Sequence, residues 1–172
     1  MKKRLMIKII AKKEEEKDTI RGRLESLSKI RTYLINDSIA KEICENESVD
    51  YSFLLGVPIS FDDIDVTAKT INGSIFLNPK LIDMDFAIMM RYVIHELVHV
   101  MQHMDEKRKI NKNKNYLNRE DEIEAFQYQI EYDAKNRSEK EALEYVDELL
   151  EFHDVPDDQV DDKRDELLSN AK

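Results

Sequence analysis

The sequence predicts an α+β protein that is predominantly helical, with a small antiparallel hairpin set among the helices. Most of the chain repeats apolar residues at three- and four-residue steps, which is typical of amphipathic helices. One stretch departs from this pattern, because two β-prone runs flank Asn72-Gly73, the strongest short signal for a β-hairpin. We expect the hairpin at about 64–78, packed beside helices at about 84–104 and 119–136.

The N-terminal part is expected to be helical. Residues 14–35 carry one apolar stripe at helical spacing, formed by Ile20, Leu24, Leu27, Ile30 and Leu34. Residues 1–12 are ambiguous between a strand and the start of that helix. Asp37-Ser38 then offers an N-terminal cap for a short helix that ends at about Asn46.

The middle of the chain carries the strand signals. The apolar stretch 51–61 is cut by Gly56 and Pro58, so we expect it to be irregular or a short strand. The two strands of the hairpin are expected at 65–71 and 74–78.

The next element is a long apolar helix. Asp83 or Asp85 can cap it, and it runs to about Met104. It is apolar around most of its circumference, as expected of a central, buried element. The basic, Asn-rich stretch 107–114 that follows is expected to be a solvated loop.

The rest of the chain predicts acidic helices. Asn118 or Arg119 begins the first of them. Ser138 opens a capping box for a helix over about 139–152. Residues 157–170 form either a last acidic helix or a frayed tail.

Composition and charge limit the classes of protein and partner. The 172 residues include three Gly, three Pro and one Cys, which argues against collagenous, loop-rich and disulfide-built proteins. We expect one domain with its core at 64–134, an N-terminal helical part (1–60) and an acidic helical part (138–172). The net charge is −10, and residues 119–172 hold 19 acidic and 7 basic side chains. Nucleic acid is therefore not an expected partner.

Three observations favour a cytoplasmic protein. Cys44 is the single cysteine and cannot form an internal disulfide. The basic start of the chain is interrupted by Lys8 and lacks a small-residue cleavage site, so we expect no signal peptide. No stretch approaches the ~18–20 apolar residues of a membrane span, so no membrane partner is expected.

The most informative motif is H-E-x-x-H, formed by His95, Glu96 and His99 on the long apolar helix. Four residues are a little over one helical turn, so the two imidazoles project from one face and can reach the same metal ion. Glu96 lies about 100° around the helix, where it can contact a water on that metal. This division of two nitrogen ligands and one base predicts a zinc site.

A tight zinc site needs a third protein ligand. His103 is one further turn along, roughly 12 Å from His95 on a straight helix, which is too far. His153 is more typical of a helix C-terminus, where positive charge is favourable. Glu122 borders the inner face of the helix at 119–136, and Glu124 is the alternative in the same cluster.

The four residues Glu122-Ile123-Glu124-Ala125 resemble the E-x-x-A motif of the gluzincin metallopeptidases, which follows H-E-x-x-H on a downstream helix. The resemblance covers about residues 64–134. It implies a zinc-dependent endopeptidase with Zn²⁺ on His95, His99 and Glu122, and with Glu96 as the general base.

The resemblance also implies how a protein or peptide substrate is held. Gluzincins lay an extended peptide along the edge strand of a small sheet, and the expected strand is Ser74, Ile75, Phe76, Leu77 and Asn78. One further donor stabilises the oxyanion, and the candidates are Tyr116, Tyr128, Tyr132 and His103. The alternative is a catalytically silent protein of the same scaffold that recognises a partner protein through its acidic C-terminal helices.

Overall fold

The computed structural model describes residues 2–105 and 113–169, and within these ranges the side chains of Glu16 and of residues from Thr19 onward. The described residues form seven α-helices and a three-stranded mixed sheet, which confirms the predicted class. The elements are α1 (Lys2–Asn36), α2 (Ser38–Asn46), α3 (Phe53–Gly56), β1 (Ile59–Phe61), β2 (Ala68–Ile71), β3 (Ser74–Leu77), α4 (Phe86–Met104), α5 (Glu120–Asn136), α6 (Glu139–Phe152) and α7 (Val160–Leu167). Two short 3-10 helices, Pro79–Asp83 and Tyr116–Asn118, precede α4 and α5.

Local side-chain chemistry fixes several of the helix starts. The Asp37 carboxylate accepts hydrogen bonds from the backbone N–H groups of Ile39 and Ala40, and so caps α2. Of the two expected caps for α4, Asp85 is the one used. Ser138 caps α6 by accepting from the N–H of Glu141, which confirms the capping box. The N-terminal ambiguity resolves to helix, since α1 begins at Lys2.

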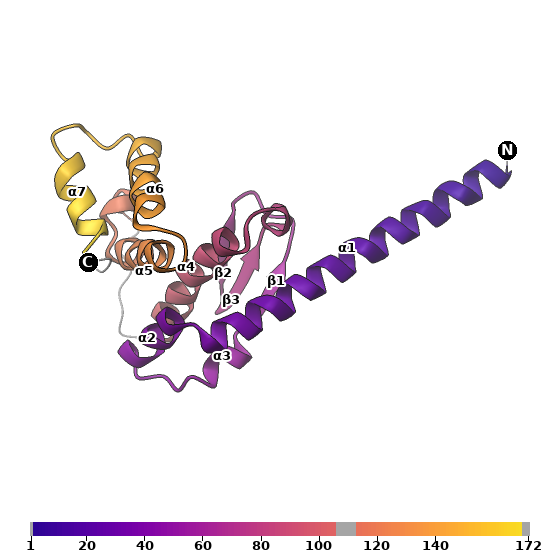
Figure 1. Ribbon diagram of the computed structural model, residues 1–172, viewed down its shortest axis with the longest axis horizontal. Helices are drawn as coiled ribbons and strands as arrows, with labels where there is room; N and C mark the ends of the chain where they lie inside the picture. Colours follow the sequence, from indigo (N-terminus) through magenta and orange to yellow (C-terminus); the bar gives the residue numbers. More distant parts are fainter. Residues whose placement is uncertain (1, 106–112, 170–172) are drawn as a thin grey trace.

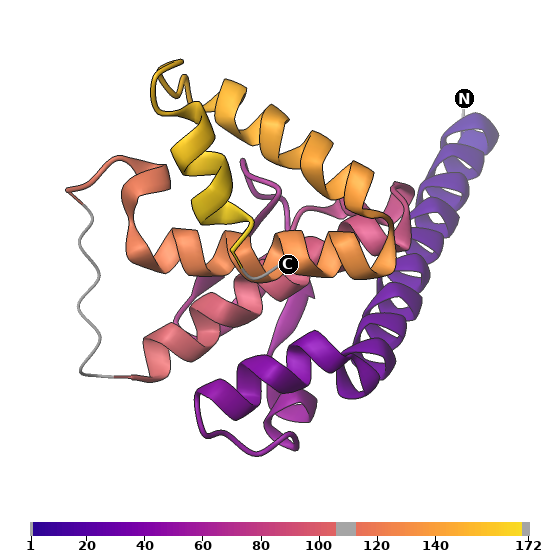
Figure 2. The ribbon, with the colours of Figure 1, turned by 60° about the vertical axis from the view of Figure 1, so that its left-hand side comes forward.

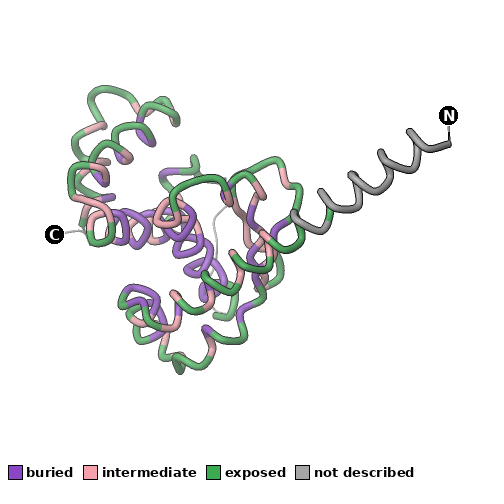
Figure 3. The backbone as a smooth tube through the Cα atoms, turned by 45° about the vertical axis from the view of Figure 1, so that its right-hand side comes forward, coloured by how far each residue is buried: buried purple, intermediate pink, exposed green. Residues whose placement is uncertain are grey.

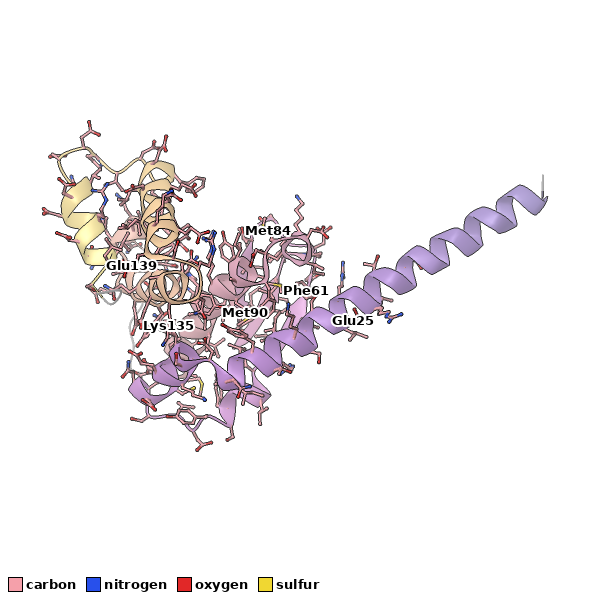
Figure 4. All side chains as sticks on the ribbon, viewed as in Figure 1. Glu25, Phe61, Met84, Met90, Lys135 and Glu139 are labelled. Atoms are coloured by element: carbon pink, nitrogen blue, oxygen red, sulfur yellow. The ribbon has the colours of Figure 1, made fainter. Side chains whose placement is uncertain are left out.

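The arrangement is a helical body with one projecting arm. The N-terminal part of α1 leaves the body, as Figure 1 shows, and Figure 4 places Glu25 on this arm whereas Met90 of α4 lies inside the body. The loop expected at 107–114 lies mostly outside the described residues. Among the described helices, none is both long and apolar enough to cross a bilayer.

The hairpin forms at the predicted turn. Asn72 and Gly73 have φ angles of 50° and 74°, as a type I′ turn requires, and glycine adopts this region at no steric cost. β2 and β3 pair in antiparallel register around them.

The sheet holds one strand more than the hairpin, and this overturns one expectation. β1 pairs with β3 in parallel, so the strand order is β1-β3-β2 and β3 is the central strand. The prediction that Ser74–Asn78 form the free edge is therefore wrong. Beside α4, the strand with an unpaired edge is β2.

Two apolar clusters meet at α5. The larger one unites α1 to α4, the sheet and one face of α5. The smaller one joins the opposite face of α5 to α6 and α7. Figure 2 shows α5 lying between α4 and the pair α6–α7, and Figure 3 shows that buried residues concentrate in α4 and α5. His95, Glu96 and His99 of α4 and Glu122 of α5 are thus held inside the protein.

Candidate metal centre

His95, His99 and Glu122 come together where α4 packs against α5. His95 and His99 are one turn apart on α4, and Glu122 lies in the first turn of α5. The two histidine Nε2 atoms are 3.2 Å apart, and Glu122 Oε2 lies 3.4 Å from that of His95 and 3.3 Å from that of His99. All three residues are at least 91% buried, with exposed fractions of 6%, 9% and 5%.

This spacing fits a small tetrahedral metal ion. Zinc binds histidine nitrogen and carboxylate oxygen at about 2.0–2.1 Å, which separates neighbouring tetrahedral ligand atoms by about 3.3–3.4 Å. The three observed separations, 3.2, 3.3 and 3.4 Å, agree with that edge length. Two nitrogens and one carboxylate oxygen are also a zinc donor set that leaves a fourth position open.

Gln102 determines which nitrogen of His99 carries the proton. Its amide NH₂ donates to the backbone oxygen of Asp121 at 2.9 Å and to Glu124 Oε2 at 2.8 Å. The amide oxygen therefore faces His99 Nδ1, at 2.7 Å, and must accept a hydrogen from it. The lone pair of a neutral His99 is then on Nε2, the atom that faces His95 and Glu122.

Glu122 divides its two oxygens between two tasks. Oε2 faces the histidines, while Oε1 lies 3.1 Å from the Arg119 guanidinium. Burial works to raise the pKa of Glu122, but hydrogen bonding with His95, His99 and Tyr116 outweighs it and holds the pKa well below its usual range. The side chain is therefore an ionised carboxylate, the form that binds a metal.

The electrostatics of His99 follow from the same contacts. Burial works to lower its pKa, and hydrogen bonding with Glu122 outweighs this effect, so that the pKa is raised. The pair therefore attracts a cation, and a metal ion competes with a proton for His99 Nε2.

Glu96 is positioned by the hairpin. The Thr70 hydroxyl on β2 shares its single hydrogen between Glu96 Oε2, at 2.8 Å, and the Glu96 carbonyl oxygen, at 3.0 Å. The contact joins the edge strand to α4. The second carboxylate oxygen of Glu96 accepts no hydrogen bond from Thr70. Glu96 is 6% exposed and lines the cavities on both sides of the histidines.

Two cavities flank the three ligand residues and share β2 as a wall. The larger, of about 590 Å³, extends between α4, α5 and α6, and the smaller, of about 440 Å³, lies on the Arg119 side. Val66, Ala68, Glu96 and Tyr116 line both of them. A two-residue turn makes Ile71 and Ser74 a hydrogen-bonded pair, so the alternation of the ladder directs the backbone groups of Ala68 and Thr70 to the unpaired edge.

The remaining predicted residues separate into those near the site and those away from it. Tyr116 lines both cavities, and its ring stacks on His153 at 5.2 Å between centroids. His103 is exposed and lines the smaller cavity, with Nδ1 2.6 Å from the backbone oxygen of His99, but it is not among the ligand residues. Glu124 also lies outside that group and accepts from Gln102.

Tyr128 and Tyr132, two of the candidates for the oxyanion donor, lie on the side of α5 that faces away from the cavities. The Tyr128 hydroxyl accepts a hydrogen bond from Asn46 of α2 at 2.6 Å. Tyr132 packs edge-on against Tyr33 of α1, with 6.3 Å between ring centroids. Both belong to the larger apolar cluster.

Sequence reasoning missed Gln102, Thr70 and Arg119. Gln102 had a usable signal, because a residue three positions after His99 lies on the same face of a helix. Thr70 and Arg119 reach the site through the approach of β2 and the loop before α5, for which the sequence holds no local signal.

Comparisons with protein families, with curated proteins and with solved structures found no match to this chain. The class of the protein therefore rests on its own fold and site. It is a mostly helical α+β protein with a small mixed sheet and a buried His-His-Glu group that could hold a metal ion.

Proposed function

We propose that the protein is a zinc-dependent peptidase of the gluzincin type. The observation that carries this proposal is the convergence of His95 Nε2, His99 Nε2 and Glu122 Oε2 within 3.4 Å of one another. Glu96 adjoins this group and lines both cavities. A site that only holds a structural metal has no need of a base at this position.

The donor set supports zinc as the metal. Imidazole suits zinc, copper, iron and nickel, and the carboxylate completes the His₂Glu set that catalytic zinc sites use. A zinc ion held there supplies a bound water of lowered pKa and a Lewis acid for a carbonyl oxygen.

The chain's own residues account for the proton transfers. Glu96 accepts the proton of the attacking water on the carboxylate oxygen that Thr70 leaves available, and returns it to the leaving amine. Tyr116 lines both cavities, and its hydroxyl is the donor proposed for the oxyanion, to which it would turn from its hydrogen bond with Glu122. Burial, and then Glu122, raise the pKa of Tyr116, so the phenol keeps its proton at neutral pH.

The substrate is proposed to be an extended peptide added to the edge of β2. Ala68 and Thr70 present backbone donors and acceptors there, two residues apart, as strand addition requires. The two cavities lie on either side of Glu96, so a peptide along β2 has side-chain space before and after the bond to be cut.

Metal content and hydrolysis, measured on protein without a His-tag, test the proposal. About one zinc per chain is expected in the wild type and in Glu96→Gln, with casein cleaved by the wild type alone. Glu122→Ala is expected to lose the zinc. Glu120→Ala is the matched control, because Glu120 is 86% exposed in the same helical turn.

Each failure has a distinct meaning. Equal zinc in the wild type and Glu122→Ala refutes the ligand assignment. Zinc without cleavage of any protein or peptide refutes the peptidase and favours a regulatory protein that binds partners through its acidic C-terminal helices.

A further inference from the structure

The larger cavity has the walls of a pocket for a flat, apolar group. Aromatic and aliphatic side chains from α4, α5 and α6 surround it, namely Tyr92, Phe126, Tyr145, Leu149 and Phe152. Its volume of about 590 Å³ is in the range of small-ligand sites. His95 and Glu96 line the same cavity, so a group bound here is next to the proposed reaction centre.

The exposure of Phe152 points in the same direction. Its side chain is 80% exposed, although it lines an apolar cavity at the C-terminal end of α6. A large apolar side chain at the mouth of such a cavity loses water contact when a ligand enters, and this favours binding.

Two buried polar atoms distinguish this cavity from a purely apolar one. Among the described residues, neither His95 Nδ1 nor Gln129 Oε1 has a hydrogen-bond partner. Both residues line the cavity, and they are 6% and 0% exposed. Gln129 is held by its NH₂ group, which donates to the Tyr145 hydroxyl at 2.9 Å, so its oxygen is the atom left over.

The two atoms have complementary hydrogen-bonding roles. His95 Nε2 is turned toward Glu122 and His99, so the hydrogen of a neutral ring is on Nδ1, which donates. Gln129 Oε1 accepts. A buried donor and a buried acceptor that both lack partners cost stability, and a ligand that serves both recovers this cost.

We infer that this cavity is a specificity pocket for a tyrosine side chain of the peptide substrate. A phenol has an aromatic body that matches the walls and a hydroxyl that accepts from His95 Nδ1 and donates to Gln129 Oε1. Phenylalanine fits the walls but leaves both atoms unpaired, and leucine fills less of the volume. The inference rests on the proposed function for the placement of the peptide along β2.

Binding to the inactive, zinc-loaded Glu96→Gln protein tests the pocket without hydrolysis. The probes are fluorescently labelled peptides of alanine and serine that carry one tyrosine, phenylalanine, leucine or O-methyltyrosine, followed by fluorescence anisotropy. Two hydrogen bonds are expected to favour tyrosine over phenylalanine by about tenfold in Kd. O-methyltyrosine, which accepts but cannot donate, is expected to bind no better than phenylalanine.

A second comparison assigns the effect to Gln129. Gln129→Leu is expected to lower the preference for tyrosine over phenylalanine, because the phenol then keeps only the hydrogen bond from His95 Nδ1. Gln127→Leu is the matched control, because Gln127 is on the same helix but contacts Glu166 and Ser169 of the α7 segment. The wild-type comparison of tyrosine with phenylalanine decides the inference even if Gln129→Leu does not fold.

The outcomes separate this inference from the peptidase proposal. Equal affinity for tyrosine and phenylalanine, or no measurable binding of the tyrosine peptide, overturns the pocket whether or not the wild type cleaves peptides. Preferred binding of tyrosine with no cleavage by the zinc-loaded wild type supports the pocket and overturns the peptidase.

Discussion

Replacing Gln102 with leucine tests whether one amide holds His99 in the tautomer that binds a metal. Leucine has a similar size but offers no acceptor to His99 Nδ1 and no donor to Asp121 and Glu124. The ring then loses the contact that keeps its hydrogen on Nδ1 and its lone pair on Nε2. The expected result is weaker zinc binding with the three ligand residues intact.

The magnitude follows from the contact that is lost. Partners that orient metal ligands are worth 10–100-fold in metal affinity, which is about 1.4–2.7 kcal/mol. The buried Nδ1–H left without an acceptor costs about 1–3 kcal/mol on its own, so the two estimates agree. We expect the Kd for zinc to rise by a factor of about 10 to 100.

Competition with a chromophoric chelator measures this Kd, and circular dichroism checks that the variant is folded. The double variant Gln102→Glu with Glu124→Gln is the rescue, because a carboxylate at 102 accepts from Nδ1 and the new amide at 124 donates to it, so that only the contact with the backbone oxygen of Asp121 is lost. The double variant is expected to bind zinc within about threefold of the wild type. A Gln102→Leu protein that is folded and binds zinc as tightly as the wild type refutes the role of this amide.

Three further predictions concern other parts of the chain. Asp133→Ala leaves the Arg91 guanidinium buried without its 2.8 Å partner, and is expected to lower the free energy of unfolding in urea by about 3 kcal/mol. Asp147→Ala, which removes one residue of an exposed ion pair, is expected to lower it by less than about 1 kcal/mol. Equal losses in the two variants would contradict a stabilising role of the buried pair. Burial raises the pKa of Cys44 to about 11, so a thiol reagent at mildly alkaline pH should label the unfolded chain much faster than the native protein. Rapid labelling of the native protein would show that the thiol is accessible. His103→Ala should leave the Kd for zinc unchanged within about twofold, because the exposed ring lies outside the ligand group, and a loss of zinc would make it a ligand.

The helices and the turn could be predicted because their signals are local. Asp37 and Ser138 act on backbone groups two or three residues away, and Asn72-Gly73 adopts its turn within the hairpin itself. The close approach of His95 and His99 follows from helical geometry alone. The prediction that Glu122 joins the two histidines required only that α4 and α5 pack side by side through their apolar faces.

The features that sequence reasoning missed depend on contacts between distant segments. The pairing of β1 with β3 joins residues 59–61 to 75–77 in parallel, and no alternation within either strand reveals that partner. Without the pairing with β1, β3 is predicted to be an edge strand. Tyr128 could have been set aside, because six residues of helix place it about 120° from Glu122 on α5. Tyr116 could not have been chosen, since a loop residue has no helical face to read.

The position of α5 between the two apolar clusters fixes the distance between the His-His-Glu group and part of the larger cavity wall. Glu122, Phe126 and Gln129 lie on successive turns of this helix, so the carboxylate of the His-His-Glu group and an unpaired amide oxygen beside the larger cavity share one rigid backbone. Seven residues separate the two, which is about 10.5 Å along the axis. That spacing is set by backbone hydrogen bonds, and exchanging side chains in the cavity leaves it unchanged. Altering the distance from Glu122 to Gln129 takes an insertion or deletion in α5, and one residue more or less would also turn Gln129 by about 100° about the helix axis.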